Sequence, residues 1–132
     1  FGEVVDHCEG GALPGHAGSW LVGGATLPGD PADAGNAPAP TVFMPSNPQV
    51  GDQFKPEDLA PLVDETVTVL KVEQTLKVEA GKFTGVMKLL ETSVLPDSSP
   101  ETKWVARGLG VIRVQGKGER LQLIPSTFLP PR

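Results

Sequence analysis

Residues 66–72, TVTVLKV, alternate apolar and polar side chains and are rich in β-branched residues. A period of two with this composition predicts a β-strand that turns one face toward a core. Residues 83–94, FTGVMKLLETSV, predict a longer strand. Alternation places Phe83, Met87 and Leu89 on one of its faces and Val86 and Leu90 on the other, which is typical of a central strand.

Further short strands are expected near residues 2–9, 18–22, 75–79 and 120–124, because apolar residues there are bounded by glycine-rich turns. The sequence GKGE at 116–119 predicts a hairpin turn, and Ala80–Gly81 another. The chain holds 16 glycines and 14 prolines, so turns and loops take a large share of it. We therefore predict an all-β fold, an antiparallel meander that forms a curved sheet or a partly closed barrel.

Several segments do not read as strands. Residues 24–41 predict a long Pro/Gly-rich surface loop, and residues 125–132 an extended tail. Residues 42–54 are expected to cross one end of the core with Phe43 and Met44 turned inward, because their prolines exclude them from the interior of a sheet. Residues 55–65, KPEDLAPLVDE, hold the only candidate helix, with Pro56 at its first turn, and an irregular segment fits them equally well.

Residues 101–114, ETKWVARGLGVIRV, suggest two strands separated by a glycine-marked bend. Glycines within strands mark bulges, bends or close backbone approach, so we expect a structural corner. Gly108 and Gly110 would allow the bend, and Trp104 would anchor it to the core. A phosphate loop is not expected, because no helix follows the glycines.

The composition narrows the function classes. The net charge of −5 argues against nucleic-acid binding, and no apolar run is long enough for a transmembrane segment. A single cysteine, Cys8, cannot form an internal disulfide. Residues 1–132 are expected to form a single β-rich domain, the C-terminal portion of a larger one, because apolar residues begin at once. Proximity to a membrane would then come through a missing N-terminal segment.

Chemically reactive residues are few. His7 and His16 with nearby carboxylates are the candidate metal ligands, although His7 and Cys8 are adjacent and would point to opposite faces of a strand. Catalysis by Cys8 would need an orienting carboxylate and an oxyanion hole, and neither is recognisable. No catalytic residue and no cofactor is therefore expected. The candidate ligand-binding residues, on one side of a curved sheet, are Phe83, Met87, Leu89, Trp104 and Val111.

Four motifs carry a resemblance to a known family. They are GSW at 18–20, MPSNPQVGD at 44–52, AGKF at 80–83 and WVARGLGV at 104–111. Together they resemble an uncharacterised family of bacterial secreted and lipoprotein-type β-rich domains. The resemblance implies an extracytoplasmic domain, periplasmic, cell-surface or secreted, with no established enzymatic role. Arg107 departs from the proline, and Cys8 from the aromatic residue, that the family tends to have at these positions.

Three functional hypotheses follow. The first is a non-enzymatic structural or interaction module of a bacterial envelope or extracellular protein, with a protein partner or self-association as a subunit of an assembly. The second is a module that binds a hydrophobic ligand or lipid on the concave face of the sheet. The third is a metal-binding domain. For self-association, we expect the first strand or residues 66–72 to contact a neighbouring chain by β-augmentation or through an apolar face.

Overall fold

The computed structural model describes residues 41–60, 63–96 and 98–126, together with the backbone of four short strands nearer the N-terminus. Contacts divide the chain into two units, Phe1–Thr41 with Leu59–Leu62, and Val42–Asp58 with Val63–Arg132. In the first unit, β1 (Gly2–Glu3) pairs with β4 (Trp20–Leu21), and β2 (His7–Glu9) pairs with β3 (Ala12–Gly15), both antiparallel. Two short strands thus lie where one was expected at residues 2–9. The predicted loop at 24–41, apart from Thr41, and the tail beyond Ser126 lie outside the described residues.

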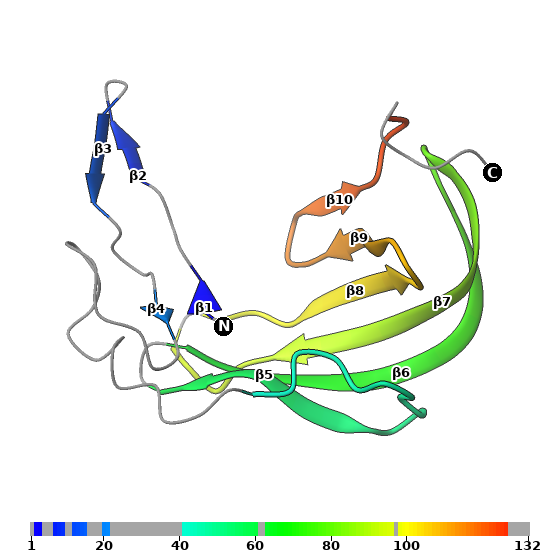
Figure 1. Ribbon diagram of the computed structural model, residues 1–132, viewed down its shortest axis with the longest axis horizontal. Helices are drawn as coiled ribbons and strands as arrows, with labels where there is room; N and C mark the ends of the chain where they lie inside the picture. The colour runs from blue at the N-terminus through cyan, green and yellow to red at the C-terminus, as the bar shows by residue number, and fades with distance from the viewer. Residues whose placement is uncertain are drawn as a thin grey trace. The chain divides into compact units, whose positions relative to one another are not determined.

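The second unit is one six-stranded antiparallel sheet. Its strands lie in the order β10-β9-β8-β7-β6-β5, so each is hydrogen-bonded to its neighbours in the chain (Figure 1). They are β5 (Gln53–Leu59), β6 (Val63–Val78), β7 (Gly81–Thr92), β8 (Glu101–Ala106), β9 (Gly110–Gln115) and β10 (Arg120–Gln122). The all-β meander is confirmed, and the sheet stays open rather than closing into a barrel.

Strand β6 runs through both segments that the sequence predicted as separate strands. Its pairing with β7 is irregular at three places. Gln74 pairs with Val86 and Leu76 with Phe83, so β7 has one residue more than β6 between these pairs. Gly85, one of the two β7 residues between these pairs, has a φ of 64°. Glu73, with a φ of 52°, lies in the neighbouring irregularity, where β6 has the additional residue. Such an insertion is a β-bulge, which breaks the alternation of side chains.

The bulge corrects one sequence expectation. Simple alternation put Phe83 on the same face as Met87 and Leu89, and this is wrong. Phe83 packs instead against a core cluster of Val86, Ala106 and Ile112, together with Leu76, Trp104 and Leu123. The other cluster, of Val67, Val69 and Leu89, is covered by Met44, Phe54, Val72, Met87 and Val105. The bent sheet therefore buries apolar residues on both of its faces.

Strands β6 and β7 curve strongly along their length (Figure 1). At the tip of their hairpin the backbone N–H of Ala80 donates to the carbonyl of Leu123, at 3.0 Å, just after β10. The hairpin tip thus lies beside the residue that follows the edge strand β10, and both Leu76 and Leu123 pack against the cluster around Val86. A curved sheet is what the sequence predicted.

Residues 55–60 and 63–65, which the structure describes, do not form a helix. Gln53–Leu59 form β5, and Val63 begins β6. Pro56, expected at a helix start, is buried in β5. Because β5 is an edge strand, one row of its N–H groups needs no partner in the sheet, and a proline is tolerated there.

Residues 101–114 form a β-hairpin, in which a tight turn joins the antiparallel strands β8 and β9. Ala106 pairs with Gly110, and the N–H of Leu109 donates to the carbonyl of Ala106 at 3.1 Å. Gly108 and Gly110 have φ angles of 74° and 100°, which L-residues rarely adopt. The chain therefore reverses direction between β8 and β9. The predicted turn at 116–119 is confirmed, with the N–H of Gly116 donating to the carbonyl of Glu119 at 3.1 Å.

The sheet order also decides which strands can pair with another chain. Residues 66–72 lie in β6, and the edge of β6 on the β5 side is covered as far as Val69, which hydrogen-bonds to Gly51 and Asp52. Contact of residues 66–72 with a neighbouring chain therefore stays a prediction, by β-augmentation only beyond Val69 or through an apolar face. The two edges of the sheet are β5 and β10. Within the described residues, no helix is long and apolar enough to cross a membrane.

Candidate functional site

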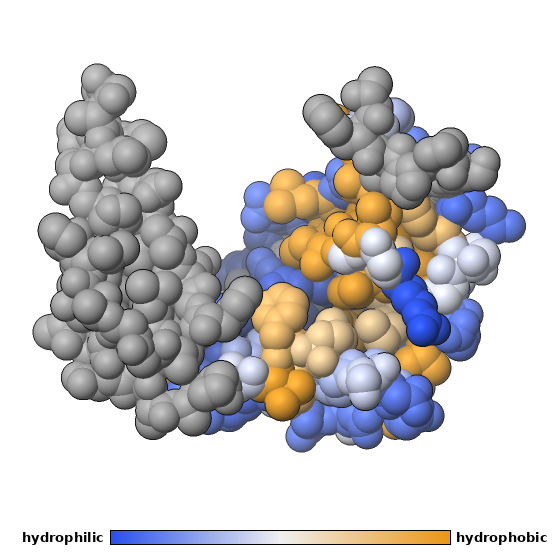
Figure 2. All heavy atoms as spheres, viewed as in Figure 1, coloured by the Kyte–Doolittle hydropathy of each residue, from blue (hydrophilic) through white to orange (hydrophobic). Residues whose placement is uncertain are grey.

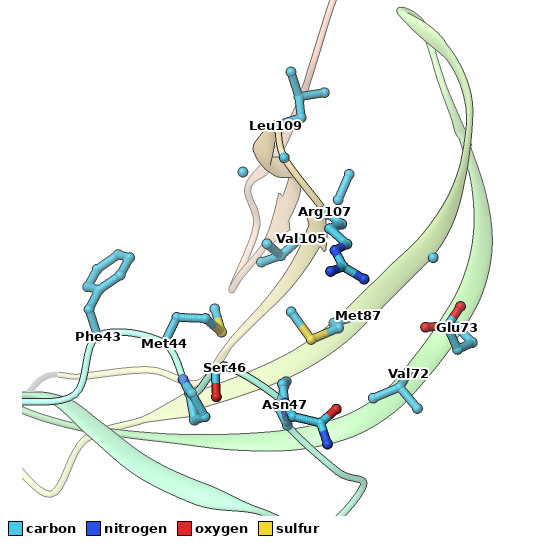
Figure 3. A pocket seen from close by; sticks show the side chains of 16 residues that line it. Phe43, Met44, Ser46, Asn47, Val72, Glu73, Met87, Val105, Arg107 and Leu109 are labelled. Atoms are coloured by element: carbon cyan, nitrogen blue, oxygen red, sulfur yellow. The ribbon is translucent and has the colours of Figure 1, made fainter.

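An open groove crosses one face of the six-stranded sheet. Its wider part has a volume of about 450 Å³ and lies between residues 43–48 and the β8–β9 hairpin (Figure 3). A narrower part of about 210 Å³ continues toward Phe54 and Val67. The two parts share Phe43, Met44, Val105 and Gly110, so we treat them as one groove, called the sheet groove below.

The floor of the sheet groove comes from alternate residues of neighbouring strands. Val69 pairs with Leu89, and Met87 pairs with Val105. Because side chains alternate across a strand, these residues project from one face of the sheet. Apolar side chains gather over β7 to β9 in the view of Figure 2. The floor is therefore a continuation of the cluster around Val67 and Leu89.

The first wall of the groove is the irregular segment before β5. Its position is held by backbone hydrogen bonds, from the Gly51 N–H to the Val69 carbonyl and from the Val69 N–H to the Asp52 carbonyl, both at 2.9 Å. The Asp52 carboxylate also accepts a hydrogen bond from the Gln49 N–H at 2.8 Å. Met44 is half-buried and packs on the core, as the sequence predicted. Phe43 does not turn fully inward, since it is 64% exposed at the rim.

The second wall is the β8–β9 hairpin, with Arg107, Leu109 and Val111. All three side chains are exposed, and Val111 is 51% exposed although it lies on a strand. The turn between β8 and β9 is tight because Gly108 and Gly110 have positive φ angles that favour glycine, and this turn borders the groove. Apolar side chains at both rims give the groove an apolar entrance.

The narrow part of the groove leads to a polar depression of about 350 Å³. Three carboxylates, of Glu65, Glu91 and Glu101, line it together with Lys103. Lys103 Nζ contacts the Glu91 carboxylate at 2.7 Å. The hydroxyl residues that complete the lining are Thr92, Ser93, Ser98 and Ser99. We call this depression the acidic end.

Two opposing effects act on the pKa of Lys103. Burial lowers it, while the hydrogen bond to Glu91 and the charges of Glu91, Glu65 and Glu101 raise it, and the net result is a raised pKa. Lys103 therefore remains protonated and neutralises one of the three carboxylates. Within the described lining of the acidic end, carboxylates outnumber the single lysine.

The five sequence-predicted ligand residues are divided between the two faces. Met87 lines the wider part of the groove, and Leu89 and Val111 line the narrower part. Phe83 and Trp104 pack around Val86 and Ile112. The Trp104 ring lies between two cations, with Lys88 Nζ 5.3 Å and the Arg113 guanidinium carbon 5.6 Å from its centroid. Trp104 thus serves the core and a cation–π arrangement rather than the groove.

The metal hypothesis falls largely outside the described residues. His7 is placed only as backbone of β2, opposite Gly15, and His16 is not described. Among the residues that the structure does describe, no three His, Cys, Asp or Glu side chains are grouped so as to hold a metal ion.

Sequence reasoning missed several groove residues. Val67, Phe54 and Val105 line the groove, and Glu65, Glu91 and Glu101 lie at its acidic end. The alternation of Glu65, Val67 and Val69 could have placed these three on one face. Their meeting with β7 and β8 depends on register, which the sequence pattern does not specify.

Comparisons with known proteins add no information about the sheet groove. No family model, no curated protein and no solved structure matches the chain.

Proposed function

We propose that the protein is a non-enzymatic interaction module that binds an apolar partner in the sheet groove. The observation that carries the proposal is the open apolar groove itself, with a floor of core residues and exposed apolar side chains on both rims. Apolar surface that stays in contact with water is costly, and a patch of this kind on a folded domain typically marks a binding surface.

The shape of the groove favours a partner that lies along it. Small-molecule sites usually enclose most of their ligand, whereas the described residues enclose this groove only in part. Phe43 and Val111, at opposite rims, could close over the sides of a bound chain. A protein partner therefore fits better than an enclosed small ligand.

The chemistry of the lining supports binding rather than catalysis. The described lining offers carboxylates, hydroxyls, one lysine and one arginine. The pKa values that are clearly shifted among the described residues belong to Lys55, Lys103 and Arg113. General acid–base catalysis near neutral pH instead needs a group whose pKa lies close to that pH.

Site-specific photo-crosslinking in the native host tests the proposal. The photoreactive residue p-benzoylphenylalanine would replace Val111 at the groove rim and, as the matched control, Val94, which is 85% exposed in the β7–β8 connection and does not line the groove. We expect a discrete crosslinked species from position 111 and none from position 94. Equal crosslinking from both positions, or none from either, would refute a partner in the groove.

The mass of the adduct distinguishes the two kinds of occupant. A shift of several kilodaltons indicates a protein, whereas a shift of a few hundred daltons indicates a lipid or another hydrophobic ligand, the second hypothesis from the sequence. We further propose that the module works in a bacterial envelope or extracellular protein, on the strength of the four family-like motifs. Cell fractionation with an antibody against the chain tests that location.

A further inference from the structure

We propose that the occupant of the sheet groove is a polypeptide segment that has apolar side chains and a lysine or arginine at the end lying against Glu65, Glu91 and Glu101. This inference rests on the proposed function, since it specifies the partner of the same groove. It is carried by the continuity between the apolar groove and the acidic end. Both include Glu65, Glu91 and Lys103 in their lining.

The acidic end concentrates negative charge on one face of the sheet. Glu91 on β7 and Glu101 on β8 are direct cross-strand partners. Like charges in directly opposite positions destabilise a sheet. Lys103 lies two residues from Glu101 on the same face, but its Nζ is paired with Glu91. The Glu101 carboxylate makes no side-chain hydrogen bond or ion pair within the described residues, and its charge acts on Lys103 only from a longer distance. A cationic group from a partner would relieve this repulsion.

The surroundings of the carboxylates suit an ammonium or guanidinium group. Lysine and arginine side chains carry several N–H donors and no acceptor, so they need a site rich in acceptors. The acidic end provides carboxylate oxygens together with the hydroxyls of Thr92, Ser93, Ser98 and Ser99. Ser93 and Ser98 belong to a connection that is ordered by its own hydrogen bonds, including Ser98 Oγ to the Ser93 carbonyl at 3.1 Å.

The same charge disfavours a membrane lipid or a fatty acid. Their apolar tails would suit the groove, but their phosphate or carboxylate head groups would lie next to Glu91 and Glu101. An unfavourable pairing of this kind rejects the wrong partner as effectively as a good contact selects the right one. The acidic end therefore favours a basic polypeptide over an anionic amphiphile.

Two matched peptide libraries test the inference on the full chain. Each peptide has four randomised positions drawn from Leu, Val, Phe and Met, followed by Lys-Lys in one library and Glu-Glu in the other. Both libraries are passed over immobilised protein at low salt, and retained peptides are quantified by mass spectrometry. We expect the Lys-Lys library to be retained about tenfold more strongly, because each exposed ion pair contributes a few-fold in affinity. The difference should shrink at high salt.

Two charge variants localise the effect. Glu101→Gln removes the unpaired carboxylate and keeps the shape, so the preference for Lys-Lys should fall about threefold. Glu79→Gln is the matched control, because it removes the same charge from the exposed β6–β7 turn while its amide oxygen can still accept from Gln122 Nε2, as the Glu79 carboxylate does at 2.8 Å. The control should leave the preference unchanged. Trp104 fluorescence during thermal unfolding checks that both variants fold.

The outcomes separate the two proposals. Equal retention of both libraries, abolished by Val111→Asp, would support the groove and overturn its preference for a basic partner. A preference for the Lys-Lys library that survives Glu101→Gln would also overturn the inference, because the lysines would then be bound somewhere other than at Glu101. Retention of neither library, with tight binding of dodecylamine, would replace the polypeptide by a cationic amphiphile. Retention of neither peptides nor dodecylamine would count against the groove itself.

Discussion

Replacing Gly85 by alanine should destabilise the sheet through the backbone alone. Gly85 has a φ of 64°, in the left-handed region. A Cβ at this position would meet only Glu73 Oε2, at 3.7 Å, which is ordinary van der Waals contact. Steric overlap therefore contributes nothing, and the cost is that of holding an L-residue in the left-handed conformation, about 1–2 kcal/mol. For a domain of 60–100 residues this lowers the melting temperature by roughly 5–15 °C.

Urea unfolding followed by Trp104 fluorescence measures this cost, in a Trp20→Phe background so that only the six-stranded sheet reports. Gly116→Ala is the matched control, because Gly116 does not have a positive φ and its added Cβ would lie 3.2 Å from Glu101 Oε1, the mobile end of a side chain. Asparagine tolerates the left-handed region better than alanine, so Gly85→Asn should cost less than Gly85→Ala. If Gly85→Ala were no worse than Gly116→Ala, the bulge would not require a left-handed residue and our explanation for the position of Phe83 would fail.

Three further predictions concern the core, the acidic end and the opposite face. Ile112 is 1% exposed, so Ile112→Ala should cost about 2–5 kcal/mol and Ile112→Val about 0.5–1.5 kcal/mol in urea unfolding; equal, small losses would contradict close packing around it. Because the pKa of Lys103 is raised in the folded protein, protonated Lys103 stabilises the fold at pH values below 10.5, the pKa of an ordinary lysine. This stabilisation is lost as the pH rises through the raised pKa of Lys103. Unfolding between pH 9 and pH 12 should therefore show a loss of stability that is smaller in the Lys103→Met variant, and identical pH profiles would exclude the linkage. Removing the cation in Lys88→Met should cost about 0.5–1 kcal/mol and change the emission of Trp104; an unchanged spectrum and stability would show that the contact contributes nothing.

Much of the sheet could be predicted because its strands carry their own local signals. Residues 66–72 alternate with a period of two, and the glycines at 116 and 118 mark a reversal between two apolar runs. Both features act over a few residues, so local sequence suffices to predict them. The antiparallel meander then follows, because short turns can join only neighbouring antiparallel strands.

The same local signals misled the interpretation of residues 55–65. A proline followed by Glu57 and Asp58 matches the start of a helix, yet Gln53–Leu59 form an edge strand. The sequence does not show that β6 offers a free edge beside this segment. Pairing with β6 provides backbone hydrogen bonds that a helix of one or two turns could not match, because such a helix is unstable by itself.

The groove and its charges belong to the tertiary structure. Alternation by itself determined that Leu89 and Val86 face opposite sides of β7. Only the bulge at Gly85 decided that Phe83 joins Val86, because one inserted residue exchanges the faces of everything beyond it. Likewise, Glu65, Glu91 and Glu101 are separated in the chain and meet only through the register of β6, β7 and β8. Register depends on the simultaneous packing of all strands, and so the chain encodes its strands locally but the sheet groove only as a folded whole.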